Sequence, residues 1–95
     1  MIAHEKDLCP IEKLTSILSD PWSVLIVRDT LISPRRFCEL EASLLGISTR
    51  TLTLKLHKLI DEEVLEHKDT YYTITKKGKK LHPIIDAMEH VGKKF

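Results

Sequence analysis

Cationic and hydroxyl side chains gather in one segment of this chain, residues 47–60. Within it Leu52, Leu56, Leu59 and Ile60 recur at helical spacing, which predicts one core-facing stripe. Ser48 precedes the periodic run, where an N-cap belongs. The other face offers hydroxyl and basic groups and no acid before Asp61: Thr49, Arg50, Thr51, Thr53, Lys55 and Lys58. Such a face suits phosphates and base edges, so DNA is the leading candidate ligand.

Other basic groups could add to this contact. Arg50, one residue into its helix, could reach guanine O6 and N7 or hold a phosphate. Arg35 and Arg36 could clamp phosphates beside the groove, or be ordinary surface charge. For the four lysines around Gly78, a solvated surface is at least as good an explanation as phosphate contact.

Two cysteines are too few and too unpatterned for a disulfide scaffold. Cys9 stands just before a predicted helix, whose N-terminus favours the thiolate; nearby Lys6 adds to this effect, whereas Glu5 and Asp7 oppose it. Redox sensing and an inert structural role both remain open for Cys9. We expect Cys38 to be a small buried residue.

The chain offers little for metal or enzyme chemistry. His82, Asp86 and His90 share a helical spacing, but the two histidines would lie about 12 Å apart along the axis. There is no Cys-x-x-Cys pair, phosphate loop or Gly-x-Ser-x-Gly motif. We therefore expect no metal, no cofactor and no enzymatic activity.

Composition is consistent with one small globular domain. The 95 residues are 42% hydrophobic and 31% charged, so wholesale disorder is not expected. The net charge is only +1, so a DNA-binding face must come from segregation of charge. No stretch approaches a membrane span, and the N-terminus lacks the apolar core of a signal peptide. These features predict a cytoplasmic protein that does not engage membranes.

Hydrophobic periodicity places these residues on short elements in the order α-α-α-α-β-β-α, a mainly α (α+β) class. Gly46 closes the third helix just before Ser48, and two helices joined by a short turn with glycine are typical of a helix-turn-helix. Pro83 predicts a kink or a late start in the last helix. The expected helices are 10–19, 21–32, 37–45, 48–60 and one after Thr75, with strands 64–68 and 71–75 around an Asp69-Thr70 turn.

Three helices followed by a hairpin form the winged-helix arrangement, and the sequence resembles the HxlR family of bacterial and archaeal transcriptional regulators. The resemblance covers nearly the whole chain in the family's order. The matching pieces are Cys9-Pro10, Asp20-Pro21-Trp22-Ser23-Val24-Leu25-Ile26-Val27-Arg28, Pro34-Arg35-Arg36-Phe37-Cys38-Glu39-Leu40, Gly46-Ile47-Ser48-Thr49-Arg50-Thr51-Leu52-Thr53, Tyr72-Thr73-Ile74-Thr75-Lys76-Lys77-Gly78 and Leu81-His82-Pro83-Ile84-Ile85.

The resemblance implies a homodimeric DNA-binding repressor or activator whose recognition helix spans about 48–60. It divides the single domain into a dimerisation helix (1–19), a winged-helix core (20–75) and a second dimerisation helix (76–95). Some family members sense oxidants or electrophiles through the cysteine that aligns with Cys9. Candidate DNA contacts are Arg35, Arg36, Ser48, Thr49, Arg50, Thr51, Thr53, Leu54, Lys55, Lys58 and Lys68; the candidate dimer interface is Ile11, Leu14, Leu18, Leu81, Ile84, Ile85, Met88 and Val91.

Three positions depart from the family pattern. The wing shrinks to about 68–71, which questions minor-groove contact. Glu63 replaces the usual glycine after the recognition helix, so either a non-glycine is forced toward positive φ or the turn differs. Leu54 replaces a polar residue and suits a thymine methyl or simple packing.

We therefore expect a DNA-binding regulator, a repressor in the first instance, that acts as a homodimer on a pseudo-palindromic operator. Regulation through Cys9 is the redox version of this hypothesis. The alternative is a winged helix used for protein contact, which the shortened wing favours.

Overall fold

The structure is a computed structural model, and it describes residues 9–95 of the chain. Residues 1–8 lie outside the described range, and with them the beginning of the predicted dimerisation segment 1–19 and the charges expected beside Cys9 at Lys6, Glu5 and Asp7. Over residues 9–95, no helix combines the length and the apolar character that crossing a membrane requires.

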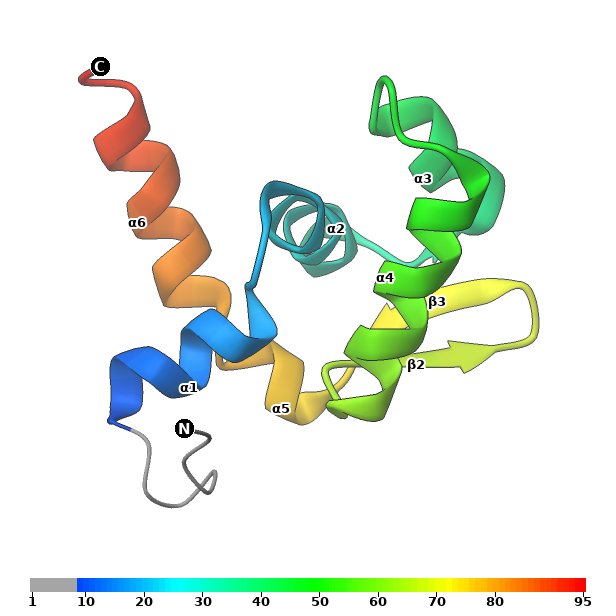
Figure 1. Cartoon of the computed structure of the whole chain (residues 1–95), viewed down its shortest axis with the longest axis horizontal. Helices are drawn as coiled ribbons and strands as arrows, with labels where there is room; N and C mark the ends of the chain where they lie inside the picture. The colour runs from blue at the N-terminus through cyan, green and yellow to red at the C-terminus, as the bar shows by residue number, and fades with distance from the viewer. Residues whose placement is uncertain (1–8) are drawn as a thin grey trace.

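Helix α2 (Pro21–Ile32) is the centre of the molecule, as its apolar sequence predicts. Figure 1 shows it between α4 (Thr49–Asp61) and α6 (His82–Gly92). Asp20 caps the helix, because its Oδ1 accepts a hydrogen bond of 2.9 Å from the Ser23 amide. Ile26 and Val27 are completely buried.

Helix α3 (Phe37–Ser43) and α4 form the predicted helix-turn-helix. Gly46 has a φ of +89°, the left-handed conformation that glycine adopts without steric cost. Ser48 then caps α4 by accepting a hydrogen bond of 3.0 Å from the Thr51 amide. The left-handed conformation predicted for Gly46 and the cap predicted for Ser48 are both confirmed, whereas α3 ends at Ser43, before the expected limit of 45.

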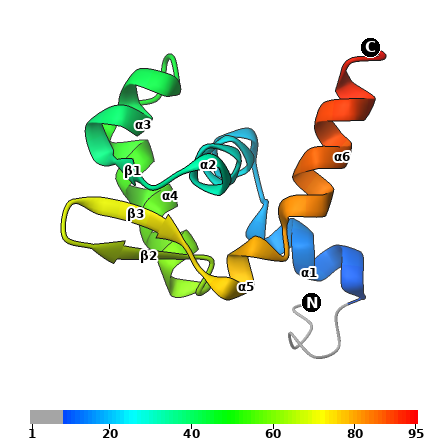
Figure 2. The ribbon, with the colours of Figure 1, turned by 180° about the vertical axis from the view of Figure 1, so that it is seen from behind.

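Strands β2 (Leu65–Lys68) and β3 (Tyr71–Ile74) form the expected tight hairpin, but the sheet has a third strand. Strand β1 (Arg35–Arg36) pairs antiparallel with β3, which gives the order β1-β3-β2 (Figure 2). Periodicity could not find β1, because two residues contain no repeat. The strand fixes the start of α3 to the hairpin.

The turn after α4 resolves the alternative left open at Glu63. This residue has a φ of +63°, so a non-glycine does take the left-handed conformation. The Glu63 amide donates to the Ile60 carbonyl at 2.9 Å, and the Val64 amide donates to the Leu59 carbonyl at 2.9 Å. These two bonds define a Schellman motif, with Val64 buried beside the end of the helix.

The predicted C-terminal helix is divided into α5 (Lys76–Lys79) and α6. Thr75 caps α5 through the Gly78 amide at 2.9 Å, and Pro83 lies in the first turn of α6, so the late start is confirmed. Gly78 is buried, and a Cβ there would collide with the Val64 carbonyl and the Ile74 side chain. Helix α5 therefore packs closely on the hairpin.

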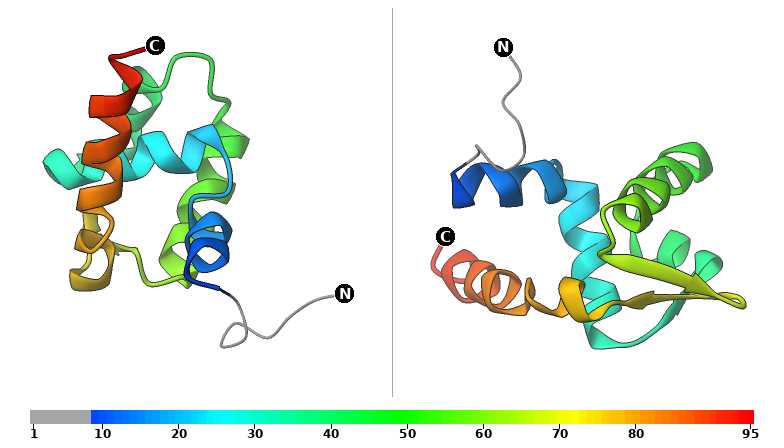
Figure 3. Two further views of the ribbon diagram at one scale, coloured as in Figure 1. Left: turned by 90° about the vertical axis from the view of Figure 1, so that its left-hand side faces the viewer. Right: turned by 90° about the horizontal axis from the view of Figure 1, so that it is seen from below.

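Helices α1 (Pro10–Ile17) and α6 lie at the end of the molecule opposite the hairpin, as the right-hand view of Figure 3 shows. Neither contains a fully buried residue. Leu81, expected in the dimer interface, is instead 4% exposed and packs in the core of its own chain, because it precedes α6 at the turn from α5.

The expectation of a buried Cys38 is wrong: its side chain is exposed. Leu40 is the buried residue of α3, and Cys38 lies two positions before it, about 200° around the helix axis.

Candidate nucleic-acid interface

The outward face of α4 is a stripe formed by Arg50, Leu54 and His57, which we call the reading stripe. All three side chains are exposed, and Leu54 keeps 58% of its surface accessible. Within residues 9–95 Arg50 has no ion-pair partner, so its guanidinium is available to an anion or a guanine. The opposite face anchors the helix through three fully buried leucines, Leu52, Leu56 and Leu59.

The exposure of Leu54 narrows the two alternatives for this residue. Packing within the chain does not explain a leucine that is more than half exposed on the same face as Arg50. An exposed apolar group at this position fits contact with a thymine methyl.

Hydroxyl groups at the start of α4 are held by neighbours in the same chain. Thr49 Oγ1 donates to Glu41 Oε2 at 2.8 Å, which joins α4 to α3. Ser48 Oγ donates to Thr51 Oγ1 at 2.9 Å, and Thr53 Oγ1 donates to the Thr49 carbonyl at 2.8 Å. Each hydroxyl oxygen can still accept a bond, so these groups remain candidate partners for base amino groups.

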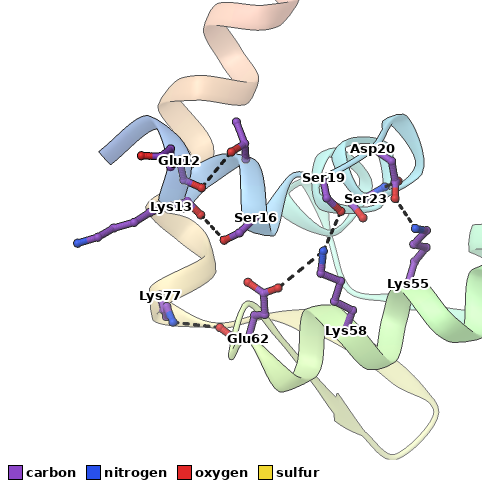
Figure 4. Close-up of polar contacts among 11 residues, drawn as sticks. Glu12, Lys13, Ser16, Ser19, Asp20, Ser23, Lys55, Lys58, Glu62 and Lys77 are labelled. Carbon is purple, nitrogen blue, oxygen red and sulfur yellow. Dashed lines mark hydrogen bonds and ion pairs between the residues drawn. The ribbon is translucent and has the colours of Figure 1, made fainter. Parts of the chain in front are cut away.

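Lys55 and Lys58 extend from α4 toward Asp20 and Ser19 (Figure 4). Lys55 forms an ion pair with Asp20, the cap of α2. The Lys58 ammonium donates to Ser19 Oγ at 2.8 Å and lies 3.9 Å from Glu62 Oε1. Both lysines thus face the junction between α1 and α2.

The sheet holds two further basic side chains near the helix-turn-helix, Arg36 of β1 and Lys68 of β2. The Arg36 guanidinium lies 5.0 Å from the centroid of the Tyr71 ring, a cation–π contact across β1 and β3. Lys68, at the tip of β2, is exposed and forms a surface ion pair with Glu66 at 3.2 Å. Arg36 and Lys68 both flank Tyr71 in the sheet, so two basic groups lie together there, although the wing itself (68–71) carries Asp69 as well as Lys68.

Arg35 has a different environment from Arg36. Its Nε donates to the Asp29 carbonyl at 3.0 Å, and its side chain is half-buried. Adjacent strand residues point to opposite faces, which explains why the two arginines diverge.

Asp29 holds α2 and α3 together beneath the interface. This carboxylate is only 4% exposed; it accepts from Arg28 Nε at 2.9 Å and from Ser43 Oγ at 2.7 Å. The bonds satisfy a buried charge that would otherwise be costly, and they join α3 to the central helix.

Among the predicted DNA contacts, Arg50 and Leu54 lie on the reading stripe, and the hydroxyl residues Ser48, Thr49, Thr51 and Thr53 lie at the start of α4. Arg36 and Lys68 lie in the sheet on either side of Tyr71. Arg35, Lys55 and Lys58 instead bind groups of their own chain. His57 was missed by the sequence reasoning. Its spacing, seven residues after Arg50 and three after Leu54, was the available signal.

A helix-turn-helix with an exposed second helix, followed by a β-hairpin, defines the winged-helix class of DNA-binding proteins. The family pattern for HxlR-like helix-turn-helix proteins matches residues 17–95, and the chain belongs to this family. It is a DNA-binding transcriptional regulator.

Individual relatives agree with this assignment. The chain is 32% identical over 93 residues to an uncharacterised HTH-type transcriptional regulator of Synechocystis sp., covering 90% of this chain and 68% of the relative. It is 37% identical over 91 residues to the uncharacterised HTH-type regulator YvaP of Bacillus subtilis, covering 86% and 83%. The structure of quinone-bound YodB from B. subtilis has a TM-score of 0.82 and 31% identity, covering 92% of this chain and 100% of that one.

Proposed function

We propose that this regulator is a repressor that binds a pseudo-palindromic operator as a homodimer through the reading stripe of α4. The observation that carries the proposal is that Arg50 and Leu54 are both exposed on one face of a helix whose other face is anchored by three buried leucines. A side chain that can pair with guanine and one that can contact a thymine methyl supply base discrimination, whereas Arg36 and Lys68 in the sheet are candidate phosphate contacts.

Substitution of Arg50 tests the mode of reading. We expect Arg50→Ala to weaken binding to an operator selected from random duplexes by about 1–3 kcal/mol and to relax preference at one base pair. Arg50→Lys keeps the charge but loses the bidentate fork. It should therefore keep phosphate affinity and still lose discrimination. Unchanged binding in Arg50→Ala would remove this residue from the reading stripe.

The end of the molecule opposite the wing supports dimerisation. An apolar groove of about 220 Å³ lies between α1, α2 and α6. Beside it Ile11 and Met88 keep 74% and 47% of their surfaces exposed. A second copy would cover these side chains and align two reading stripes with the two halves of a palindrome. The residues lining the groove are Ile11, Leu14, Thr15, Leu18, Val24, Ile84 and Met88.

Sedimentation tests the dimer. We expect the wild type to be dimeric and Met88→Glu to be monomeric, because a charge in the groove would be buried without a partner. Glu89→Gln, at the neighbouring position on α6, is the matched control and should remain dimeric. A wild type that stays monomeric at all concentrations would contradict the proposal.

Repression is tested with a reporter whose promoter overlaps the selected operator. Expression of the wild type should lower the reporter signal, and Arg50→Ala should restore it. A signal that rises with the wild type would identify an activator.

Cys9 supports a redox-responsive form of the same function. Its thiol is exposed at the N-cap of α1, where Sγ accepts a hydrogen bond of 3.4 Å from the Glu12 amide. Chemical modification of Cys9 would remove this cap from a helix with no fully buried residue. YodB, 31% identical in its solved structure, is described there as quinone-bound.

Treatment with diamide, peroxide or a quinone should change the operator affinity of the wild type and of Cys38→Ser, but not that of Cys9→Ser. Cys38→Ser is the matched control, because Cys38 is also an exposed thiol. An equal response in all three proteins would exclude sensing through Cys9.

A further inference from the structure

The inward-turned lysines of α4 are basic groups that the reading stripe does not use. Lys55 is 28% exposed and Lys58 is 38% exposed, less than expected of free lysines on a small domain. Their ammonium groups lie beside residues from a different part of the chain (Figure 4). Lys58 and Ser19, for example, are 39 positions apart in sequence.

The acceptors are two residues of the α1–α2 junction, and Glu62 at the end of α4 also lies near Lys58. Asp20 binds the Lys55 ammonium through Oδ2 and caps α2 through Oδ1, so one carboxylate serves both helices. Ser19, one position earlier, accepts from Lys58. Burial raises the pKa of Asp20, but its bonds to Lys55 and Ser23 outweigh this effect and leave the pKa below its ordinary value.

The apolar contacts of this junction with the core are only partly buried. Helix α1 has no fully buried residue, and its apolar side chains Leu14, Ile17 and Leu18 are only partly covered. Lys55 lies at the middle of α4 and Lys58 in its C-terminal half, whereas Arg50 lies at its N-terminal end. The two polar contacts therefore attach α4 to the α1–α2 junction in addition to its three buried leucines, and they do so without occupying the reading stripe.

We propose that Lys55 and Lys58 are positioning residues, which orient the recognition helix by binding Asp20 and Ser19 at the α1–α2 junction, and that neither contacts DNA phosphate in the complex. The inference rests on the proposed reading of an operator by α4. It reassigns two basic residues that a charge pattern alone would place on the DNA.

A double-mutant cycle distinguishes a positioning contact from a phosphate contact, because the two predict opposite changes in DNA affinity when Asp20 is substituted. The variants are Lys55→Met, Asp20→Asn and the double variant; asparagine keeps the cap of α2. For a positioning contact, Asp20→Asn lowers specific affinity in the wild type and has no such effect in Lys55→Met. For a phosphate contact, removing Asp20 frees Lys55 and raises affinity, and more in the wild type than in Lys55→Met. The cycle cancels any general effect of removing one negative charge.

Salt dependence and specificity provide the second readout. Loss of a phosphate contact lowers the slope of log affinity against log salt by about 0.9. We expect Lys55→Met and Lys58→Met to keep the wild-type slope, and the ratio of specific to non-specific affinity to fall about two- to fivefold, the size typical of a partly exposed ion pair. Lys68→Met, at the wing, is the matched control and should lower the slope.

Measurements on the DNA-free protein separate this inference from the proposed function. Amide hydrogens of α4 should exchange faster in Lys55→Met and Asp20→Asn alike, and Lys55→Arg should restore the wild-type rate. If the wild type selects no operator, the proposed function fails. The exchange measurement still tests whether Lys55 and Asp20 position α4, because it needs no DNA. Three results would overturn the inference. The first is an unchanged exchange rate of the α4 amides, and the second is a lowered salt slope in Lys55→Met. The third is a rise in DNA affinity in Asp20→Asn that disappears when Lys55→Met is also present.

Discussion

Ser23 places a hydroxyl in the apolar centre of α2. Its Oγ is buried and has no hydrogen-bond partner within residues 9–95. An unpaired buried hydroxyl costs about 1–3 kcal/mol of desolvation, and alanine also has a higher helix propensity. We therefore predict that Ser23→Ala raises the free energy of unfolding by about 1 kcal/mol, measured by urea denaturation.

Ser43→Ala is the matched control for that prediction. The Ser43 hydroxyl donates to the buried Asp29 carboxylate at 2.7 Å, so its removal leaves a charge with one bond fewer. The same substitution should therefore destabilise the protein at Ser43 and stabilise it at Ser23. A loss of stability in Ser23→Ala would show that its hydroxyl has a partner after all.

Asp20 gives the protein a defined acid sensitivity. Its pKa is lowered from an ordinary value of 3.8, so ionised Asp20 stabilises the fold above that value and this stabilisation is lost as the pH falls through the lowered pKa. Asp20→Asn does not ionise there. The difference in unfolding free energy between wild type and variant should be constant near neutral pH and shrink below about pH 4. A difference that grows on acidification would contradict the lowered pKa.

Among the elements, the turn that ends α4 carries the clearest local strain. Glu63 occupies the C′ position of a Schellman motif at a φ of +63°, where a Cβ is unfavourable and glycine is preferred. We predict that Glu63→Gly raises the unfolding free energy by about 0.5–1 kcal/mol, the balance of relieved strain and a more flexible unfolded chain.

Asp69→Gly serves as the comparison for Glu63→Gly. Asp69 also has a positive φ, +55°, but aspartate tolerates this conformation better than glutamate does. Its gain in thermal denaturation should be the smaller of the two. A Glu63→Gly protein less stable than the wild type would show that the glutamate side chain contributes more than its conformation costs.

The elements also show what sequence can and cannot predict here. Caps and breakers act within a few residues, so Asp20, Gly46 and Ser48 fixed the helix limits closely. Strand β1 was not predicted, because its two residues form a strand only by pairing with β3. The position of Cys38 was missed because the buried side of α3 is set by its neighbours.

In the candidate site too, local features could be predicted from the sequence and tertiary contacts could not. The buried stripe of α4 follows from spacing alone, and with it the exposure of Arg50 and Leu54. The directions of Lys55 and Lys58 do not, because Ser19 and Asp20 come beside α4 only when the chain folds. A basic residue at the edge of a recognition helix therefore needs its tertiary neighbour before its role can be assigned.

The molecule as a whole has two ends joined by α2. Helix α4 and the hairpin lie at one end, and α1 and α6 lie at the other (Figure 1). In the proposed complex, each protomer contacts one half-site. A two-fold axis through the α1–α6 end would repeat the reading stripe on the same side of the duplex.

Half-site spacing tests this arrangement of the whole molecule. Two recognition helices on one face of B-DNA require half-site centres about 34 Å apart, one helical turn, or a multiple of it. Inserting five base pairs into the centre of the selected operator turns one half-site to the opposite face and should reduce affinity to that of a single half-site. Inserting ten base pairs restores the face but doubles the separation, so a rigid dimer should regain little. Gel-shift titration of the three duplexes measures the effect, and Met88→Glu, as a monomer, should bind all three equally. Equal affinity of the wild type for all three would show that one protomer reads the operator alone.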